Sequence, residues 1–170
     1  MERKTERLWI RSLRGDDWMQ MKRIFWDFTQ SRYAIYDAPF PEDEEGVKAL
    51  TERFAESGLF FGVFLPEEPE MIGYVCFHEH NEGYDLGYCF HSSVHGKGYA
   101  YGAVSALMDY FAAERSVRCF TAGTALENGP SCALLKKLGF VCRSTEALAF
   151  HKDSAGKDIE FVGGNFVLKR

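Results

Sequence analysis

Two glycines flank a lysine in the stretch Val94-His95-Gly96-Lys97-Gly98-Tyr99-Ala100. An apolar segment with strand character precedes this stretch, and an amphipathic pattern with helical spacing follows it. The first N–H groups of a helix have no partner within the helix and carry a partial positive charge, so they bind phosphate groups well. Glycine lets the backbone approach an anion closely and adopt positive φ. The stretch therefore predicts an anion-binding loop.

Three kinds of phosphate-binding loop can be compared with this pattern. A Walker A loop requires Ser or Thr after Gly-Lys, and here Gly98 follows Lys97. A Rossmann loop requires G-x-G-x-x-G, but Gly102 comes one residue too late and Asp109 is too near to bind a ribose. An acyl-CoA pyrophosphate loop is compatible with the residues. A tight turn without any ligand also accounts for the glycines when the loop is considered alone.

Motifs elsewhere in the chain favour the acyl-CoA interpretation. In order, they are Gly87-Tyr88, Gly96–Ala100, Asn128 with Ser131, and Leu138-Gly139-Phe140. In this combination the chain resembles the GNAT superfamily of acyl-CoA-dependent N-acetyltransferases, and within it the RimJ/RimL-like branch, which acetylates protein N-termini and related amines. The opening residues 7–11 and a closing hairpin turn at residues 153–157 fit the same pattern. The resemblance covers nearly the whole chain.

The resemblance implies which residues contact the cosubstrate, acetyl-CoA. Backbone amides of the glycine loop would hold the pyrophosphate, with His95 where the family usually has Gln, Arg or Trp. The strand before the loop would splay from its neighbour, so that its free backbone groups pair with pantetheine and an N–H stabilises the oxyanion. The expected contacts are Phe90, His95, Gly96, Lys97, Gly98, Tyr99, Ala100, Asn128 and Ser131.

The chemistry requires a general base, because an ammonium group cannot attack a thioester. Asp85 occupies the place where many relatives carry a catalytic Glu, so it is the first candidate, acting directly or through a water molecule. The other candidates are His78, His80, His91, Glu79 and Glu127. Two histidines without a third ligand are a weak case for a metal, and none is expected.

Many members of the family protonate the leaving thiolate with a Tyr, and in this chain that position is Leu135. Ser131 is the substitute candidate for this acid. Solvent could also supply the proton, because an ordinary thiol has a pKa of about 8.5. Asn128 and Ser131 also suit the start of a helix, where Asn caps the first turn.

The remaining pattern shows which elements position these residues. Strands are expected at 8–13, 59–65, 71–78, 84–90, 117–123, 140–151 and 159–168, with turns at 66–70 and 81–83. Helices are expected after Gly15-Asp16-Asp17, over 41–56, after the glycine loop and over 128–138. The sequence thus predicts an α/β fold: one mixed, mostly antiparallel, twisted sheet of about seven strands with about four helices on its two faces, forming a single domain over 1–170.

Composition limits the function further. The 170 residues carry 20 Lys and Arg against 25 Asp and Glu, a net charge of −5, which argues against a nucleic-acid binder. No stretch is long and apolar enough to span a membrane, and no signal peptide is apparent. The five cysteines are odd in number and form no CxxC pair, which favours reduced thiols in a cytoplasmic protein.

These observations predict an N-acetyltransferase that passes an acetyl group from acetyl-CoA directly to a primary amine. The aromatic side chains of Trp18, Trp26, Tyr33, Tyr36 and Phe40 are candidates for the walls of the acceptor site. The acceptor, a protein N-terminus or a small amine, stays open, as does the choice between monomer and homodimer. The alternative function is an acyl-CoA-binding or sensing module with weak or lost catalysis.

Overall fold

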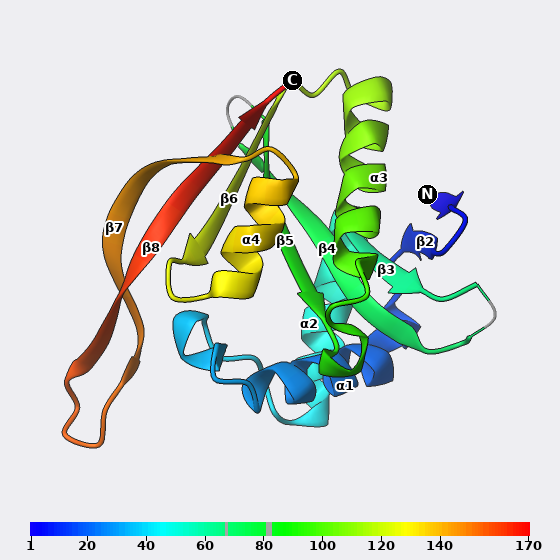
Figure 1. Cartoon of the computed structure of the whole chain (residues 1–170). Coiled ribbons are helices and arrows are strands. Elements are labelled where there is room, and N and C mark those ends of the chain that lie inside the picture. The colour runs from blue at the N-terminus through cyan, green and yellow to red at the C-terminus, as the bar shows by residue number, and fades with distance from the viewer. Residues whose placement is uncertain (67, 81–82) are drawn as a thin grey trace.

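The computed structural model describes residues 1–66, 68–80 and 83–170. Within them the chain forms one eight-stranded sheet in the order β1-β2-β3-β4-β5-β6-β8-β7 (Figure 1). Glu67 of the predicted 66–70 turn, and Asn81 and Glu82 of the predicted 81–83 turn, lie outside the described residues. The strands are β1 (Glu2–Lys4), β2 (Trp9–Ser12), β3 (Phe60–Phe64), β4 (Met71–His80), β5 (Gly83–Phe90), β6 (Cys119–Ala125), β7 (Val141–Lys152) and β8 (Asp158–Lys169).

The mixed, mostly antiparallel sheet predicted from the sequence is confirmed, with one strand more than expected. The additional strand is β1, a short edge strand that pairs antiparallel with β2. Its residues Glu-Arg-Lys are all charged and exposed. Without an apolar face, the strand has no alternation that sequence reasoning could detect.

Four α-helices cover the two faces of the sheet (Figure 1). Helices α1 (Trp18–Thr29) and α2 (Glu44–Ser57) pack on one face around Met21, Ile24 and Phe25. Helices α3 (Tyr99–Glu114) and α4 (Gly129–Lys137) pack on the other, where the core includes Leu107, Phe111 and Leu135. Two separate apolar clusters therefore sandwich the sheet. In the described part of the chain, no helix is both long and apolar enough to cross a membrane.

Helix α2 starts later than the sequence predicts, and helix α1 starts where it is expected but without the expected side-chain cap. Helix α2 starts at Glu44, after the predicted Pro41, because the Asp43 side chain accepts a hydrogen bond from Gly46 N at 2.8 Å and caps the helix there. Asp17 immediately precedes α1, but its side chain makes no cap. Its carboxylate instead binds the guanidinium of Arg11 with two hydrogen bonds of 2.8 and 2.7 Å.

The buried pair of Arg11 and Asp17 ties β2 to the start of α1. Both side chains are at least nine-tenths buried, so losing one partner leaves a charge without compensation. We expect Arg11→Met to lower the free energy of unfolding by about 3 kcal/mol in urea denaturation. The exposed pair of Lys152 and Asp158 is the control, and Lys152→Met should cost less than about 1 kcal/mol. Equal losses in the two variants would contradict this assignment.

The sheet splits between β5 and β6. These strands are parallel neighbours, yet they pair only at Tyr84 with Phe120 and at Asp85 with Thr121. Beyond that point β6 continues along β8 over its whole length, while β5 continues along β4. Among the described residues, the second half of β5 therefore has a backbone edge without a strand partner, as the splayed strands of the predicted fold require.

Candidate active site

Two cavities meet at the split in the sheet. One, of about 480 Å³, runs past the glycine loop and the start of α3, and we call it the loop cavity. The other, of about 330 Å³, lies between β5, β6 and the β7–β8 hairpin, and we call it the hairpin cavity. Residues that line both are Phe28, Tyr33, Tyr88, Asn128 and Ser131. A molecule in one cavity can therefore touch a molecule in the other.

The glycine loop has the conformation that an anion-binding turn needs. Gly96 and Gly98 adopt φ of 74° and 79°, in the left-handed region that other residues rarely occupy. Gly98 is the N-cap of α3, so the next N–H groups are those that a helix leaves unpaired. Gly96, Gly98, Tyr99 and Ala100 line the loop cavity. The predicted loop thus lies at the N-terminus of α3 and lines the loop cavity.

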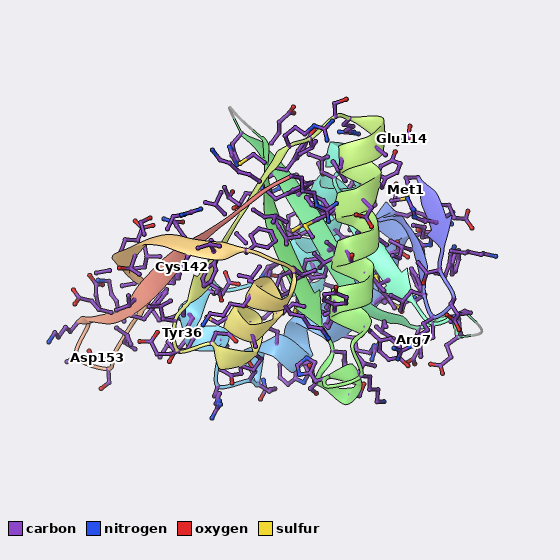
Figure 2. All side chains as sticks on the ribbon, turned by 45° about the horizontal axis from the view of Figure 1, so that its top comes forward. Met1, Arg7, Tyr36, Glu114, Cys142 and Asp153 are labelled. Carbon is purple, nitrogen blue, oxygen red and sulfur yellow. The ribbon has the colours of Figure 1, made fainter. Side chains whose placement is uncertain are left out.

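Arg7 holds this loop from outside, and sequence reasoning assigned it no role. Its Nη2 donates to the Lys97 carbonyl at 2.9 Å, and its guanidinium lies 4.6 Å from the centre of the Tyr99 ring. Figure 2 shows Arg7 near the foot of α3. Because the two residues are 90 positions apart in sequence, no local pattern could reveal the contact.

His95, a predicted cosubstrate contact, makes a bond within the protein that the sequence did not predict. Its Nε2 donates to the Phe90 carbonyl at 2.7 Å, which fastens the loop to the end of β5. His91 N donates to Ile72 of β4, so the backbone groups of Phe90 face the split side of the strand. The Phe90 carbonyl is therefore occupied by His95, whereas its N–H faces the open edge. Both residues also line the loop cavity.

Asn128 and Ser131 lie where α4 begins. Asn128 is the N-cap, and its side chain accepts from Ser131 N at 3.3 Å. The Ser131 hydroxyl lies 2.8 Å from the Tyr88 hydroxyl, which also contacts the Ser131 carbonyl at 3.4 Å. Burial raises the pKa of Tyr88 to about 12, so its hydroxyl keeps its proton at neutral pH. The sequence predicted Ser131 at this place but gave no role to the Tyr88 side chain.

Leu135 is buried and lines the hairpin cavity at the position where many relatives carry Tyr. Leu135 has no hydroxyl, but the paired hydroxyls of Tyr88 and Ser131 line the same cavity. Two of the five predicted wall aromatics, Tyr33 and Tyr36, line the hairpin cavity. Of the others, Phe40 stacks on Phe25 with ring centres 4.1 Å apart, and Trp26 is exposed.

Asp85 lies just before the split and is not among the described residues that line the two cavities. Its Oδ1 accepts a hydrogen bond from the Thr121 hydroxyl at 2.8 Å, and His80 Nε2 lies 3.1 Å from the same hydroxyl. Strand alternation puts Asp85 on the same face as Gly87, which does line the hairpin cavity. The two positions are about 6.6 Å apart along the strand, a gap that a water molecule can bridge.

None of the other predicted base candidates is among the described residues that line the two cavities. His78, Glu79 and Glu127 are exposed. His91 lies 3.6 Å from Asp27 of α1, whose carboxylate accepts two hydrogen bonds from Ser92. Although burial alone would raise the pKa of Asp27, these bonds lower it. In the ranges that the structure describes, no group of three or more His, Cys, Asp or Glu side chains is placed to hold a metal ion.

Two carboxylates that sequence reasoning did not select line the hairpin cavity: Asp37, after the short helix Ala34–Tyr36, and Glu146 of β7. Asp37 is exposed when the residue is taken as a whole. Burial of its carboxyl nevertheless raises the pKa of Asp37, against the opposing effects of the Ala38 N–H and His151. A raised pKa makes a carboxylate a better proton acceptor.

The raised pKa of Asp37 predicts a pH-dependent stability. Relative to an unfolded pKa of about 3.9, the folded protein holds this proton more tightly, so the stabilisation is complete at low pH and is lost as pH rises through the folded pKa. We expect Asp37→Asn to be more stable than the native chain near pH 7, with the difference shrinking toward about pH 4. Urea denaturation at the two pH values measures this. A native chain that is more stable at pH 7 than the variant would contradict it.

Comparisons with known proteins agree with this geometry. A family model described as "Acetyltransferase (GNAT) domain" matches residues 7–141. The match covers most of the chain, so the chain belongs to the GNAT acetyltransferase family. The chain is therefore an acetyltransferase enzyme, and its fold is that of a solved GNAT-family acetyltransferase.

Individual relatives and solved structures are similar along most of their length. An uncharacterised N-acetyltransferase, YnaD of Bacillus subtilis (strain 168), is 28% identical over 137 residues, which are 79% of each chain. A GNAT-family acetyltransferase from Bacillus anthracis has a TM-score of 0.81 at 24% identity, covering 99% of this chain and 98% of that one. The ribosomal-protein-S5-alanine acetyltransferase of Vibrio fischeri has a TM-score of 0.78 at 19% identity, covering 97% and 95%.

Proposed function

We propose that the protein is an acetyl-CoA-dependent N-acetyltransferase of the RimJ/RimL-like kind, which transfers acetyl directly to a primary amine. The observation that carries this proposal is the meeting of two cavities at the split between β5 and β6. Direct transfer requires both substrates to be bound at once with their reacting atoms in contact. The fold likeness to a ribosomal-protein alanine acetyltransferase supports the branch.

The loop cavity suits acetyl-CoA. Backbone N–H groups at the start of α3 suit the pyrophosphate, and Gly96 and Gly98 let the backbone come close to it. The free edge of β5, including Phe90 N–H, suits the amides of the pantetheine arm. With acetyl-CoA bound in this way, the thioester would lie near Tyr88 and Ser131, which line both cavities.

The chain's residues then perform three tasks during the transfer. A carboxylate on the acceptor side accepts a proton from the ammonium, so that the amine attacks the thioester carbonyl. A backbone N–H on the free edge of β5 stabilises the oxygen that gains negative charge. A hydroxyl of the Tyr88 and Ser131 pair gives its proton to the departing thiolate and regains one from solvent, while the nitrogen releases its remaining extra proton to solvent as the amide forms.

Thiol release tests the proposal directly. We expect the purified protein to release CoA thiol from acetyl-CoA only when amines are present, with acetylated amines identified by mass spectrometry. Tight CoA binding without turnover on any amine would instead favour an acyl-CoA-sensing module. Absence of a thermal shift with CoA would contradict the cofactor assignment itself.

The hydroxyl pair makes a separate prediction. We expect Tyr88→Phe and Ser131→Ala each to lower kcat about 10-fold with little change in acetyl-CoA affinity, because solvent can still protonate the thiolate. The loss should shrink for thioesters whose thiol is more acidic, since these need less help to leave. Leu135→Tyr in the Ser131→Ala background should restore part of the rate. A loss independent of the leaving thiol would contradict the role.

The cysteines support a cytoplasmic setting for this activity. Each of the five lies in the described ranges and is free. Burial raises the pKa of Cys76 to about 12 and also raises that of Cys89, so neither is a reactive thiolate. We propose that the protein works as a monomer or homodimer in a reducing compartment, which mass photometry and localisation of a tagged chain would test.

A further inference from the structure

The hairpin cavity has features that bear on which amine is acetylated. Its outer walls come from the segment around the short helix Ala34–Tyr36 and from β7 and β8. Tyr36 packs edge-on against Phe161 with ring centres 5.2 Å apart, and Phe161 lies 5.7 Å from Phe150. Figure 2 shows Tyr36 alongside the hairpin, whereas Asp153 lies at its tip. Three aromatic rings in mutual contact therefore line this cavity.

The charges of this cavity have one sign. Among the described residues that line it, the carboxylates are Asp37 and Glu146, and none is Lys, Arg or His. The carboxylates lie on different walls, one in the segment after Ala34–Tyr36 and the other on β7. Glu146 accepts a hydrogen bond from Asn165 at 3.3 Å. The loop cavity differs, because Lys137 and His95 line it.

This lining favours one chemical class of acceptor. An ammonium group gains from the two carboxylates and from aromatic ring faces. A carboxylate on the acceptor would meet like charges and no Lys, Arg or His among the cavity's described lining residues, so its lost hydration would not be compensated there. The volume of about 330 Å³ is at the small end of ligand pockets, which suits a compact molecule.

We propose that the acceptor is a compact primary amine with an aromatic or aliphatic body and no carboxylate, of the phenethylamine type. The inference rests on the proposed function and specifies its second substrate. Free amino acids are excluded by charge. A peptide N-terminus also has no carboxylate next to its amine. A cavity of this size cannot hold the residues that follow, however, so they would have to extend outside it.

Matched acceptors test the proposal on the full-length protein. Phenethylamine and phenylalanine differ only by the carboxylate, and a tripeptide with N-terminal phenylalanine carries the same side chain on a peptide. We expect kcat/KM for phenethylamine to exceed that for phenylalanine by about 100-fold, and to exceed that for the tripeptide. Binding of each acceptor to the protein with CoA, measured by calorimetry, should give the same order without turnover.

Two variants separate the effect of the cavity's negative charge from the effect of removing any carboxylate from the hairpin. Glu146→Gln should narrow the preference for phenethylamine over phenylalanine by about 10-fold. Glu160→Gln is the matched control, since Glu160 is exposed on the same hairpin and is not among the cavity's described lining residues. It should leave the ratio unchanged. An equal change in both variants would overturn the charge argument.

The outcomes distinguish the two levels of the proposal. Turnover of phenylalanine or of the tripeptide at a rate above that of phenethylamine would leave the N-acetyltransferase function standing and overturn the acceptor class. No turnover of any amine, with acetyl-CoA still bound, would overturn the function and the acceptor class together. Turnover led by phenethylamine would support both.

Discussion

Gly98→Asp is expected to abolish detectable binding of acetyl-CoA, with affinity falling at least about 100-fold, or about 2.7 kcal/mol. Gly98 has φ of 79°, which strains any residue with a side chain, and it caps the helix whose N–H groups are proposed to bind the pyrophosphate. The aspartate would add a negative charge at the same place. Isothermal titration calorimetry with acetyl-CoA measures the loss.

The fold offers a matched control for this variant. Gly156, in the β7–β8 turn, has the same φ of 79° and no atom within 4 Å of an added Cβ. Gly156→Asp therefore reproduces the backbone strain and the charge far from the loop cavity. It should retain native affinity. Unaltered binding by Gly98→Asp, or equal loss in both variants, would refute the anion-binding role of the loop.

Asp37→Asn is expected to lower kcat/KM for the amine by about 100-fold or more, with acetyl-CoA affinity unchanged, because removing a general base typically costs that much. Asp37 lines the hairpin cavity, and burial raises the pKa of its carboxyl. In the native chain, the apparent pKa of the acid limb of the pH–rate profile should therefore lie above the ordinary Asp value of about 3.9. That limb should disappear in the variant.

Asp85→Asn distinguishes this assignment from the one that the sequence predicted. Asp85 is bound to Thr121 and reaches the cavity only through the space beside Gly87, so we expect a smaller loss. If Asp85→Asn instead removes the acid limb and Asp37→Asn keeps it, Asp85 is the base, acting through water. Thr121→Val, which frees the Asp85 carboxylate, would then shift the limb.

The sequence was informative wherever the signal is local. Gly96 and Gly98 occur in a pattern that fits a strand-to-helix turn, and both adopt positive φ. Asn128 precedes a helix with Pro130 in its first turn, and it is the cap. Hydrophobic periodicity placed the main strands and helices because burial repeats every two or about 3.6 residues. These features depend on neighbours within a few positions.

Tertiary structure decided everything that joins distant segments. The contact of Arg7 with Lys97, the pair of Tyr88 and Ser131, and the places of Asp37 and Glu146 each link elements far apart in the chain. The sequence by itself determined an acetyltransferase fold with a glycine loop at a helix N-terminus. Only the folded sheet, by parting β5 from β6, decided which side chains meet there, because a cavity's charge depends on all of its walls at once.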